Sequence, residues 1–200
     1  MQTDSGDYYI LTNGVESIRD VPGLTCEIGL RAGGGSEYIM RALHDTGQYT
    51  RTHIAIDPYG NIEYETSEGQ RTRHDYTNDM RDDCMVEIFK LAKELRINFV
   101  FFNLEDTEFF KAFPHGVPIY RKYRHDENQY AFVHFDGPHA YAPLAVEFDF
   151  FNARAPKGAV FVFDDVANYD HDKFETNILF LNQWALIEKT GIKASYRKTG

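Results

Sequence analysis

The sequence predicts an α/β fold with a doubly wound, mostly parallel sheet of seven strands that ends in an antiparallel hairpin. Short apolar runs alternate with helical patterns along the chain, which is typical of parallel strands joined by helices. A glycine-rich turn at residues 33–35 closely follows the first apolar run. The 200 residues suffice for one domain with its own core, so we expect residues 1–200 to form a single domain.

The expected strands are short and largely apolar. They span residues 24–30, 53–57, 98–104, 130–135, 159–163, 184–189 and 193–198. Gly191 lies between the last two, so we expect these two strands to pair as an antiparallel hairpin at one edge of the sheet.

Helices are expected in most of the connections. They cover about residues 36–44, 79–96, 107–113 and 141–154. Ser36 can cap the first helix, and apolar residues three and four positions apart mark the second. Residues 114–129 are polar, and we expect an irregular surface insertion there.

The composition argues against several classes of protein. The formal net charge is −10, whereas a large nucleic-acid interface needs a basic face, so no nucleic-acid partner is expected. No stretch approaches a transmembrane span and the N-terminus lacks the features of a signal peptide, so no membrane partner is expected either. Cys26 and Cys84 indicate neither a disulfide framework nor a zinc site, which favours a cytoplasmic location. The sequence does not decide between a monomer and a homodimer, and dimers are the commonest oligomers.

The glycine-rich turn indicates a ligand site. Glycines after a first strand let the backbone approach a ligand closely at the carboxyl edge of the sheet. The spacing G-x-x-x-G-G from Gly29 to Gly34 differs from the G-x-G-x-x-G of dinucleotide sites. Glu27 suits a cationic ligand better than a pyrophosphate, and S-adenosylmethionine carries a sulfonium and an ammonium. The alternative is a plain tight turn beside a surface Glu27.

Two aspartates extend this hypothesis. Asp57 ends the second strand, where a doubly wound nucleoside site places a carboxylate for ribose hydroxyls. It could equally form a turn before Pro58. Asp106 follows the third strand and could accept a hydrogen bond from an adenine amino group, or it could be a helix N-cap.

Three acidic side chains predict a metal site. Asp136 follows the fourth strand, and Asp164 and Asp165 follow the fifth. Neighbouring strands of a doubly wound sheet open onto one crevice, so these carboxylates should lie together and repel one another. Mg²⁺ relieves such repulsion and prefers oxygen ligands. As alternatives, Asp-Gly is a common turn and Asp-Asp can cap a helix.

His139 is the candidate general base. It lies three residues after Asp136, close enough to reach a substrate hydroxyl at the metal. Histidine titrates near neutral pH and can accept a proton there, and a metal would lower the pKa of the hydroxyl. The alternative is an ordinary surface histidine.

Four motifs together resemble a known family. They are E-x-G-x-x-x-G-G-G-S, I-D-P-Y, D-G-x-H-x-Y and G-x-x-x-x-F-D-D, and they run from about Gly23 to Asp165. The chain resembles class I S-adenosylmethionine-dependent methyltransferases, which have a Rossmann-like fold. It is most similar to the group that includes macrocin O-methyltransferase and related sugar methyltransferases, methyltransferase family 24. Catechol O-methyltransferase has Lys where this chain has His139, and Asp-Asn where it has Asp164-Asp165, which favours the sugar-type relatives.

The resemblance implies a set of roles for residues around the crevice. The residues expected around the cofactor are Glu27, Gly29, Arg31, Gly33, Gly34, Ser36, Asp57, Asp106 and Asp136. The expected Mg²⁺ ligands are Asp136, Asp164 and Asp165, and His139 is the expected general base.

The function expected from these features is S-adenosylmethionine-dependent, Mg²⁺-assisted O-methylation of a sugar or another hydroxylated small molecule. Polar segments that could cover the acceptor, or could simply be solvated loops, hold Arg71, Arg73, His74, Tyr169 and His171. Two alternatives stay open. One is an NAD-dependent oxidoreductase, and the other is a catalytically silent nucleoside-binding domain on the same fold.

Overall fold

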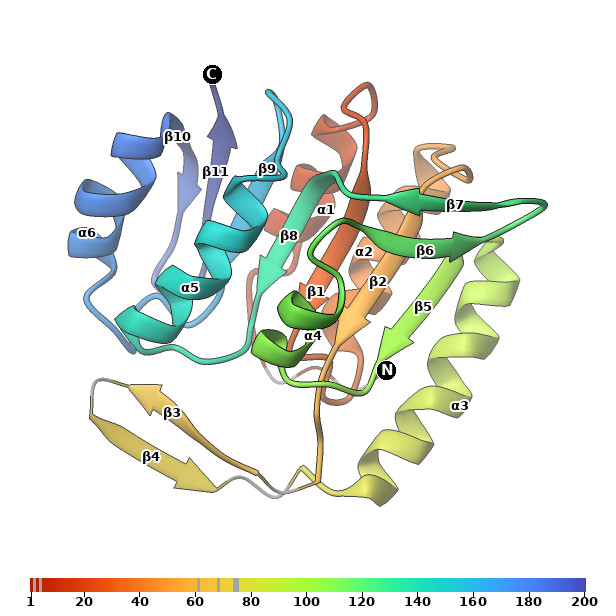
Figure 1. Cartoon of the computed structure of the whole chain (residues 1–200), viewed down its shortest axis with the longest axis horizontal. Coiled ribbons are helices and arrows are strands. Elements are labelled where there is room, and N and C mark those ends of the chain that lie inside the picture. The colour runs from red at the N-terminus through yellow and green to blue at the C-terminus, as the bar shows by residue number, and fades with distance from the viewer. Residues whose placement is uncertain (2, 4, 61, 68, 74–75) are drawn as a thin grey trace.

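A computed structural model describes residues 1, 3, 5–60, 62–67, 69–73 and 76–200 of the chain. A seven-stranded sheet crosses the molecule in the order β10-β11-β9-β8-β1-β2-β5 (Figure 1). Its strands are β1 (Leu24–Ile28), β2 (Thr52–Ile56), β5 (Asn98–Phe102), β8 (Tyr130–Phe135), β9 (Val160–Phe163), β10 (Trp184–Lys189) and β11 (Ala194–Lys198). Neighbouring strands from β5 to β9 pair in parallel, whereas β11 runs antiparallel to both β9 and β10. The predicted fold class is confirmed.

Helices cover both faces of the sheet. One face holds α1 (Tyr9–Ser17), α2 (Gly34–Asp45) and α3 (Asn78–Leu95), whose apolar sides share one core cluster. The other face holds α4 (Asp106–Ala112), α5 (Tyr141–Asn152) and α6 (His171–Phe174), which share the second cluster. A π-helical turn (Glu175–Leu179) and a 3-10 turn (Phe180–Asn182) lead from α6 into β10. Within the described residues, no helix is long and apolar enough to span a membrane.

The aromatic side chains mostly fill the core under α5. Strands β1, β2, β8 and β9 are buried along their whole length because helices cover both of their sides. Phe135 stacks on Phe163 with ring centroids 4.6 Å apart, and Phe161 stacks on Trp184 at 4.0 Å. These pairs join the neighbouring strands β8 and β9 and fasten β10 to the sheet.

Five short elements that differ from the sequence-based expectation lie outside the large sheet. They are helix α1 and the hairpins β3 (Glu63–Ser67) with β4 (Gln70–Arg73), and β6 (Val117–Tyr120) with β7 (Arg124–Glu127). The prediction of an irregular insertion at residues 114–129 is therefore wrong. Val117 and Ile119 alternate with more exposed neighbours and are fully buried, so β6 is anchored to the core despite its polar surroundings.

The topology brings the loops that follow the parallel strands together at one edge of the sheet. The carboxyl ends of the parallel strands all lie on the same side, and the β3–β4 hairpin projects beyond that edge (Figure 1). The β6–β7 hairpin lies toward the opposite edge. Strand β1 ends at Ile28 rather than at residue 30, because Gly29 has a left-handed φ of 83° and turns the chain.

Gly29 gives a stability prediction. A Cβ at this position would lie 2.0 Å from the Asp136 carbonyl oxygen, so Gly29→Ala adds a backbone clash to the cost of positive φ. Gly47 also has positive φ, but no atom lies within 4 Å of its Cβ position. We expect Gly47→Ala to lower the free energy of unfolding by about 1–2 kcal/mol and Gly29→Ala by about 3 kcal/mol or more. Urea unfolding of both variants measures the difference, and equal losses would contradict the close approach.

Candidate active site

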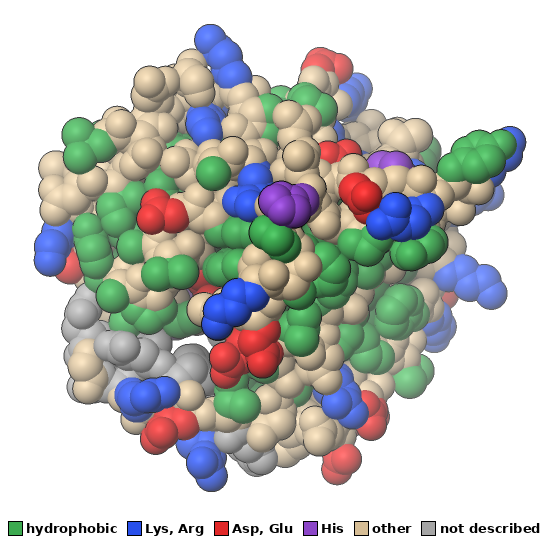
Figure 2. Space-filling view, in the orientation of Figure 1, with side chains coloured by type: hydrophobic (Ala, Val, Ile, Leu, Met, Phe, Trp, Pro, Cys, Tyr) green, Lys and Arg blue, Asp and Glu red, His purple; other side chains and the backbone are tan. Residues whose placement is uncertain are grey.

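A cavity of about 560 Å³ opens at the carboxyl edge of the sheet. Loops after the parallel strands line one side, and Ile62, Glu63 and Arg71 line it from the segment that carries the β3–β4 hairpin. Figure 2 shows this face hollowed between the hairpin and the body of the molecule. The expected site residues in its wall are Gly29, Arg31, Asp57, Asp106, Asp136, His139, Asp164 and Asp165.

Four of the expected cofactor residues do not line the cavity. Glu27, Gly34 and Ser36 are buried behind the wall, and Gly33 caps α2 with a φ of 81°. A Cβ at Gly33 would meet the Met1 side chain and the Cys84 sulfur, so this glycine serves the packing of α2. These residues support the loop from behind, and their contact with a cofactor stays a prediction.

Asp57 ties two loops of the cavity wall together. Its carboxylate accepts hydrogen bonds from the Arg31 N–H at 2.8 Å and from the Tyr59 N–H at 2.9 Å. The Tyr59 hydroxyl donates back to the Arg31 carbonyl at 2.5 Å. Burial raises the pKa of Asp57, although the backbone donors oppose this. Asp57 therefore forms the expected turn and also faces the cavity.

Asp106 is the first residue of α4 rather than its N-cap. Glu105 is the cap, in a capping box with Glu108, so the N-cap alternative for Asp106 is wrong. The Asp106 carboxylate accepts the Thr107 N–H at 2.6 Å and lines the cavity.

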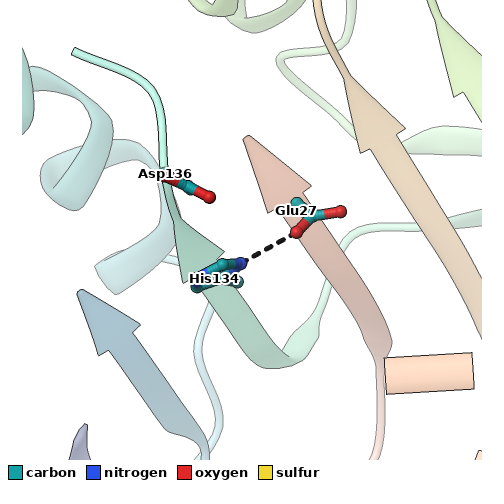
Figure 3. A group of neighbouring side chains, drawn as sticks. All are labelled: Glu27, His134 and Asp136. Atoms are coloured by element: carbon teal, nitrogen blue, oxygen red, sulfur yellow. Dashed lines mark hydrogen bonds and ion pairs between the residues drawn. The ribbon is translucent and has the colours of Figure 1, made fainter. Parts of the chain in front are cut away.

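A buried polar network lies directly behind this wall. The Glu27 carboxylate accepts a hydrogen bond from the Ser36 hydroxyl and lies 2.9 Å from His134 Nδ1 (Figure 3). Ser36 Oγ is also 2.8 Å from His53 Nε2, and His53 Nδ1 is 3.0 Å from Thr25 Oγ1. Burial lowers the pKa of His53 to about 3, so His53 stays neutral at physiological pH. Glu27 is thus an internal, hydrogen-bonded acid and not a surface residue.

Gly35 makes room for this network. A Cβ on Gly35 would lie 1.9 Å from Glu27 Oε1 and 3.1 Å from His134 Nδ1. The third glycine of the turn therefore lets α2 begin directly against the Glu27 side chain.

Asp136 and Asp164 follow residues that pair in register between β8 and β9, as expected. Burial raises the pKa of Asp136 well above its usual range, and the charge of Asp164 adds to the rise. Ligand atoms of Glu27, His134 and Asp136 all lie within 4.8 Å of one another (Figure 3). Asp136 therefore lies beside the buried Glu27–His134 pair as well as in the cavity wall.

Asp164 is already paired with a cation. Its carboxylate binds Lys193 Nζ, and it accepts hydrogen bonds from the Ser5 hydroxyl at 3.1 Å and the Asp165 N–H at 2.7 Å. Burial alone would raise the pKa of Asp164, but His134 and Lys193 outweigh it and lower this pKa. The sequence places no base beside these acids, yet the fold brings Lys193 to them from the C-terminal hairpin.

His139 and Asp165 form a pair at the mouth of the site. His139 Nε2 lies 3.4 Å from Asp165 Oδ2, and Asp165 has a left-handed φ of 49°. Burial lowers the pKa of His139, although Asp165 and Asp164 pull it upward. A neutral imidazole on the cavity wall can accept a proton from a bound hydroxyl.

A family model described as a methyltransferase domain, methyltransferase family 24, matches residues 26–166. The chain belongs to this methyltransferase family. The match spans every motif that predicted the family, from the glycine turn to Asp165, and confirms that prediction. No curated protein matches the chain.

Solved structures share the fold of this methyltransferase at low sequence identity. The calicheamicin methyltransferase CalS11 is 15% identical with a TM-score of 0.62, over 96% of this chain and 78% of that one. An O-methyltransferase from Bacillus cereus, solved in complex with SAH, is 12% identical with a TM-score of 0.63, over 98% and 83%. The O-methyltransferase NovP is 15% identical with a TM-score of 0.59, over 96% and 79%.

The residues expected to cover the acceptor divide into three groups. Arg71 lines the cavity, whereas Arg73 is exposed and not part of its wall, and His74 lies outside the described residues. Tyr169 and His171 are buried, so their proposed covering role is wrong. His171 sits between the hydroxyls of Tyr169 and Tyr196, at 2.7 Å from each.

Sequence reasoning missed His134, Lys193, Ser5 and Glu147. A histidine inside the otherwise apolar run Y-A-F-V-H-F was the available signal for His134. Glu147 is fully buried behind Gly137, and neither of its oxygens has a hydrogen-bond partner among the described residues. Burial and the charge of Asp106 raise the pKa of Glu147 well above its usual range. Nothing in the local sequence distinguishes Glu147 from a solvated helical glutamate.

His171 gives a prediction about acid stability. Burial lowers its pKa to about 4 from an unfolded value near 6.5, so the unfolded chain binds more protons between these pH values. The stability tied to neutral His171 is present above pH 6.5 and is lost as pH falls, by on the order of 2–3 kcal/mol at pH 4. We expect His171→Gln to remove this part of the pH dependence in denaturant unfolding. The exposed His125→Gln variant should keep the wild-type slope, and a wild-type slope in His171→Gln would contradict the assignment.

Proposed function

We propose that this methyltransferase uses S-adenosylmethionine to methylate a hydroxyl oxygen of a sugar or another hydroxylated small molecule, assisted by Mg²⁺. The observation that carries the proposal is the placement of His139, Asp136, Asp164 and Asp165 in one cavity with the glycine turn and Asp57, in a chain of this family. S-adenosylmethionine would supply the methyl group, and Mg²⁺ would supply positive charge that lowers the pKa of the acceptor hydroxyl.

The cavity fits a cationic nucleoside. Asp57, Asp106 and Asp136 line it from the segments that follow β2, β5 and β8, and Gly29 also lies in its wall. Asp57 would accept from ribose hydroxyls and Asp106 from an adenine amino group, while the acidic wall would attract the sulfonium and ammonium charges. The Bacillus cereus neighbour was solved with SAH, which supports this class of ligand.

The acids supply oxygen donors suited to a divalent cation, although the described side chains whose ligand atoms all lie within 4.8 Å of one another are Glu27, His134 and Asp136. Asp136, Asp164 and Asp165 offer hard oxygen donors from two adjacent strand ends, which is the chemistry that Mg²⁺ selects. Burial raises the pKa of Asp136, the charge of Asp164 adds to the rise, and Lys193 opposes it. We assign these three residues as the ligands.

The chain's own residues would handle the proton. His139 faces the cavity with Nε2 toward Asp165, so Asp165 orients the ring and stabilises the imidazolium that forms when His139 accepts the acceptor's proton. The cavity wall would hold the acceptor oxygen in line with the methyl donor, since positioning supplies much of the barrier reduction in such displacements.

A small-molecule acceptor is favoured over RNA. One structural neighbour is an rRNA methylase at 7% identity, but the net charge of −10 offers no footprint for nucleic acid. Another is described as a TDP-rhamnose 3'-O-methyltransferase, which supports a sugar acceptor.

Cys26 and Cys84 are both free and buried, which favours the cytoplasm as the compartment. We also propose that residues 1–200 form one domain and that the protein forms a homodimer. Sedimentation measurements of the molecular mass test the homodimer.

Cofactor binding tests the first half of the proposal. Wild-type protein should bind SAH in calorimetry and should not bind NAD. Asp57→Asn should weaken SAH binding about tenfold or more, because it removes a charged acceptor. Asp45, exposed at the end of α2, provides the control Asp45→Asn, which should bind as wild type does. Tight binding of NAD instead of SAH would overturn the proposed cofactor and would favour an oxidoreductase reaction.

Turnover tests the role of His139. A screen of sugars, catechols and other hydroxylated metabolites, with and without Mg²⁺, provides the acceptor. On that acceptor His139→Gln should lower kcat by on the order of 10²–10⁴, the usual worth of a positioned base. SAH affinity should stay near wild type, and the exposed His115→Gln control should keep full activity. A loss of less than a few-fold in His139→Gln would make His139 an ordinary wall residue.

A further inference from the structure

Lys193 is a fully buried cation at the edge of the active site. It directly precedes β11, and its ammonium forms an ion pair with Asp164. Its ammonium also donates to Ser5 Oγ at 2.9 Å and lies 4.9 Å from the centre of the Tyr8 ring. Burying an ammonium is costly unless it is paired, so Lys193 is held here by these specific partners.

The partners of Asp164 leave little room for a further cation. Oδ1 accepts from Ser5 and from the Asp165 N–H, and Oδ2 binds Lys193. His134 Nε2 lies 3.8 Å from the same Oδ2. A divalent ion that uses Asp164 must therefore share this carboxylate with Lys193 or displace its ammonium.

We propose that Lys193 is a built-in competitor of the divalent cation, which holds Asp164 in the absence of metal and lowers the metal affinity of the site. The proposal rests on the metal role assigned to Asp136, Asp164 and Asp165 above. Two like charges a few ångströms apart repel strongly in a partly buried site, so metal and ammonium cannot both lie close to Asp164 at no cost.

The structure provides an alternative place for the ammonium. Ser5 Oγ can keep its hydrogen bond to Lys193, and the face of Tyr8 attracts a cation. Lys193 can therefore withdraw from Asp164 toward Ser5 and Tyr8 without losing every partner. A metal ion can therefore separate Lys193 from Asp164 reversibly. When metal is absent, the Lys193 ammonium remains as a counter-ion of the acidic cluster.

The test is metal binding rather than activity. Lys193→Met removes the charge and keeps the length of the side chain, and Lys193→Arg keeps the charge. Titration calorimetry with MgCl₂ should show at least tenfold tighter binding in Lys193→Met than in wild type, and near wild-type binding in Lys193→Arg. Lys189 lies on β10 of the same hairpin and pairs with Asp172 and Glu175 away from the cavity. Lys189→Met is the matched control and should leave Mg²⁺ affinity unchanged.

If Lys193→Met is unstable, the melting temperature Tm with and without Mg²⁺ provides a second test. Removing one partner of a buried pair leaves Asp164 unpaired, so metal-free Lys193→Met should have a lower Tm. Added Mg²⁺ should raise this Tm more than that of wild type, and recovery of folded protein on adding Mg²⁺ would support the proposal. An equal or smaller Mg²⁺ effect than in wild type would overturn it.

The outcomes separate this proposal from the proposed function. SAH binding, measured on the same samples, reports whether the cofactor cavity is intact. If wild type binds Mg²⁺ and Lys193→Met binds it equally or more weakly, only the proposed role of Lys193 is overturned. SAH binding with no Mg²⁺ binding in any variant would overturn both the metal site and the role of Lys193, and would leave the cofactor assignment standing.

Discussion

The buried carboxylate of Glu27 is the constraint on which the rest of the site depends. A carboxylate inside a sheet is costly unless it is hydrogen-bonded, and Glu27 has two such partners, Ser36 at the start of α2 and His134 on β8. These bonds fix where α2 begins and how β1 lies against β8. Gly35 is needed for the same reason, since a side chain there would overlap the Glu27 carboxylate. The glycine turn is therefore shaped as much by what lies behind it as by the ligand proposed in front of it.

The positions of the strands of the large sheet and of the acids that follow them could be read from the sequence because both depend on local signals. Apolar runs such as Y-A-F-V-H-F mark strands that are buried on both faces, and parallel strands bring their carboxyl ends to one edge. Asp57, Asp136 and Asp164 follow such runs directly, so their presence in one cavity needed no knowledge of tertiary contacts. The family match rests on the same motifs.

What could not be predicted depends on contacts between distant segments. Lys193 reaches Asp164 across 29 residues, and Ser5 reaches it across 159. Tyr169 and His171 lie in a polar stretch but fold inward because Tyr196 completes their hydrogen bonds. The hairpins β3–β4 and β6–β7 were missed because β3, β4 and β7 are short, polar and rich in charged residues, and therefore resemble loops. For Lys193, Ser5 and His171, a partner far away in the chain overrides the local pattern.

The buried carboxyl group of Glu147 has a consequence for how tightly the folded protein holds protons. The formal net charge of −10 counts Glu147 as an anion, as it would be in an unfolded chain. Full burial raises the pKa of Glu147 well above its usual range, and Asp106 adds to the rise. The raised pKa of Asp136 acts in the same direction. The folded protein therefore holds protons on these two carboxyl groups more tightly than an unfolded chain would, so acid favours the folded state at these two positions.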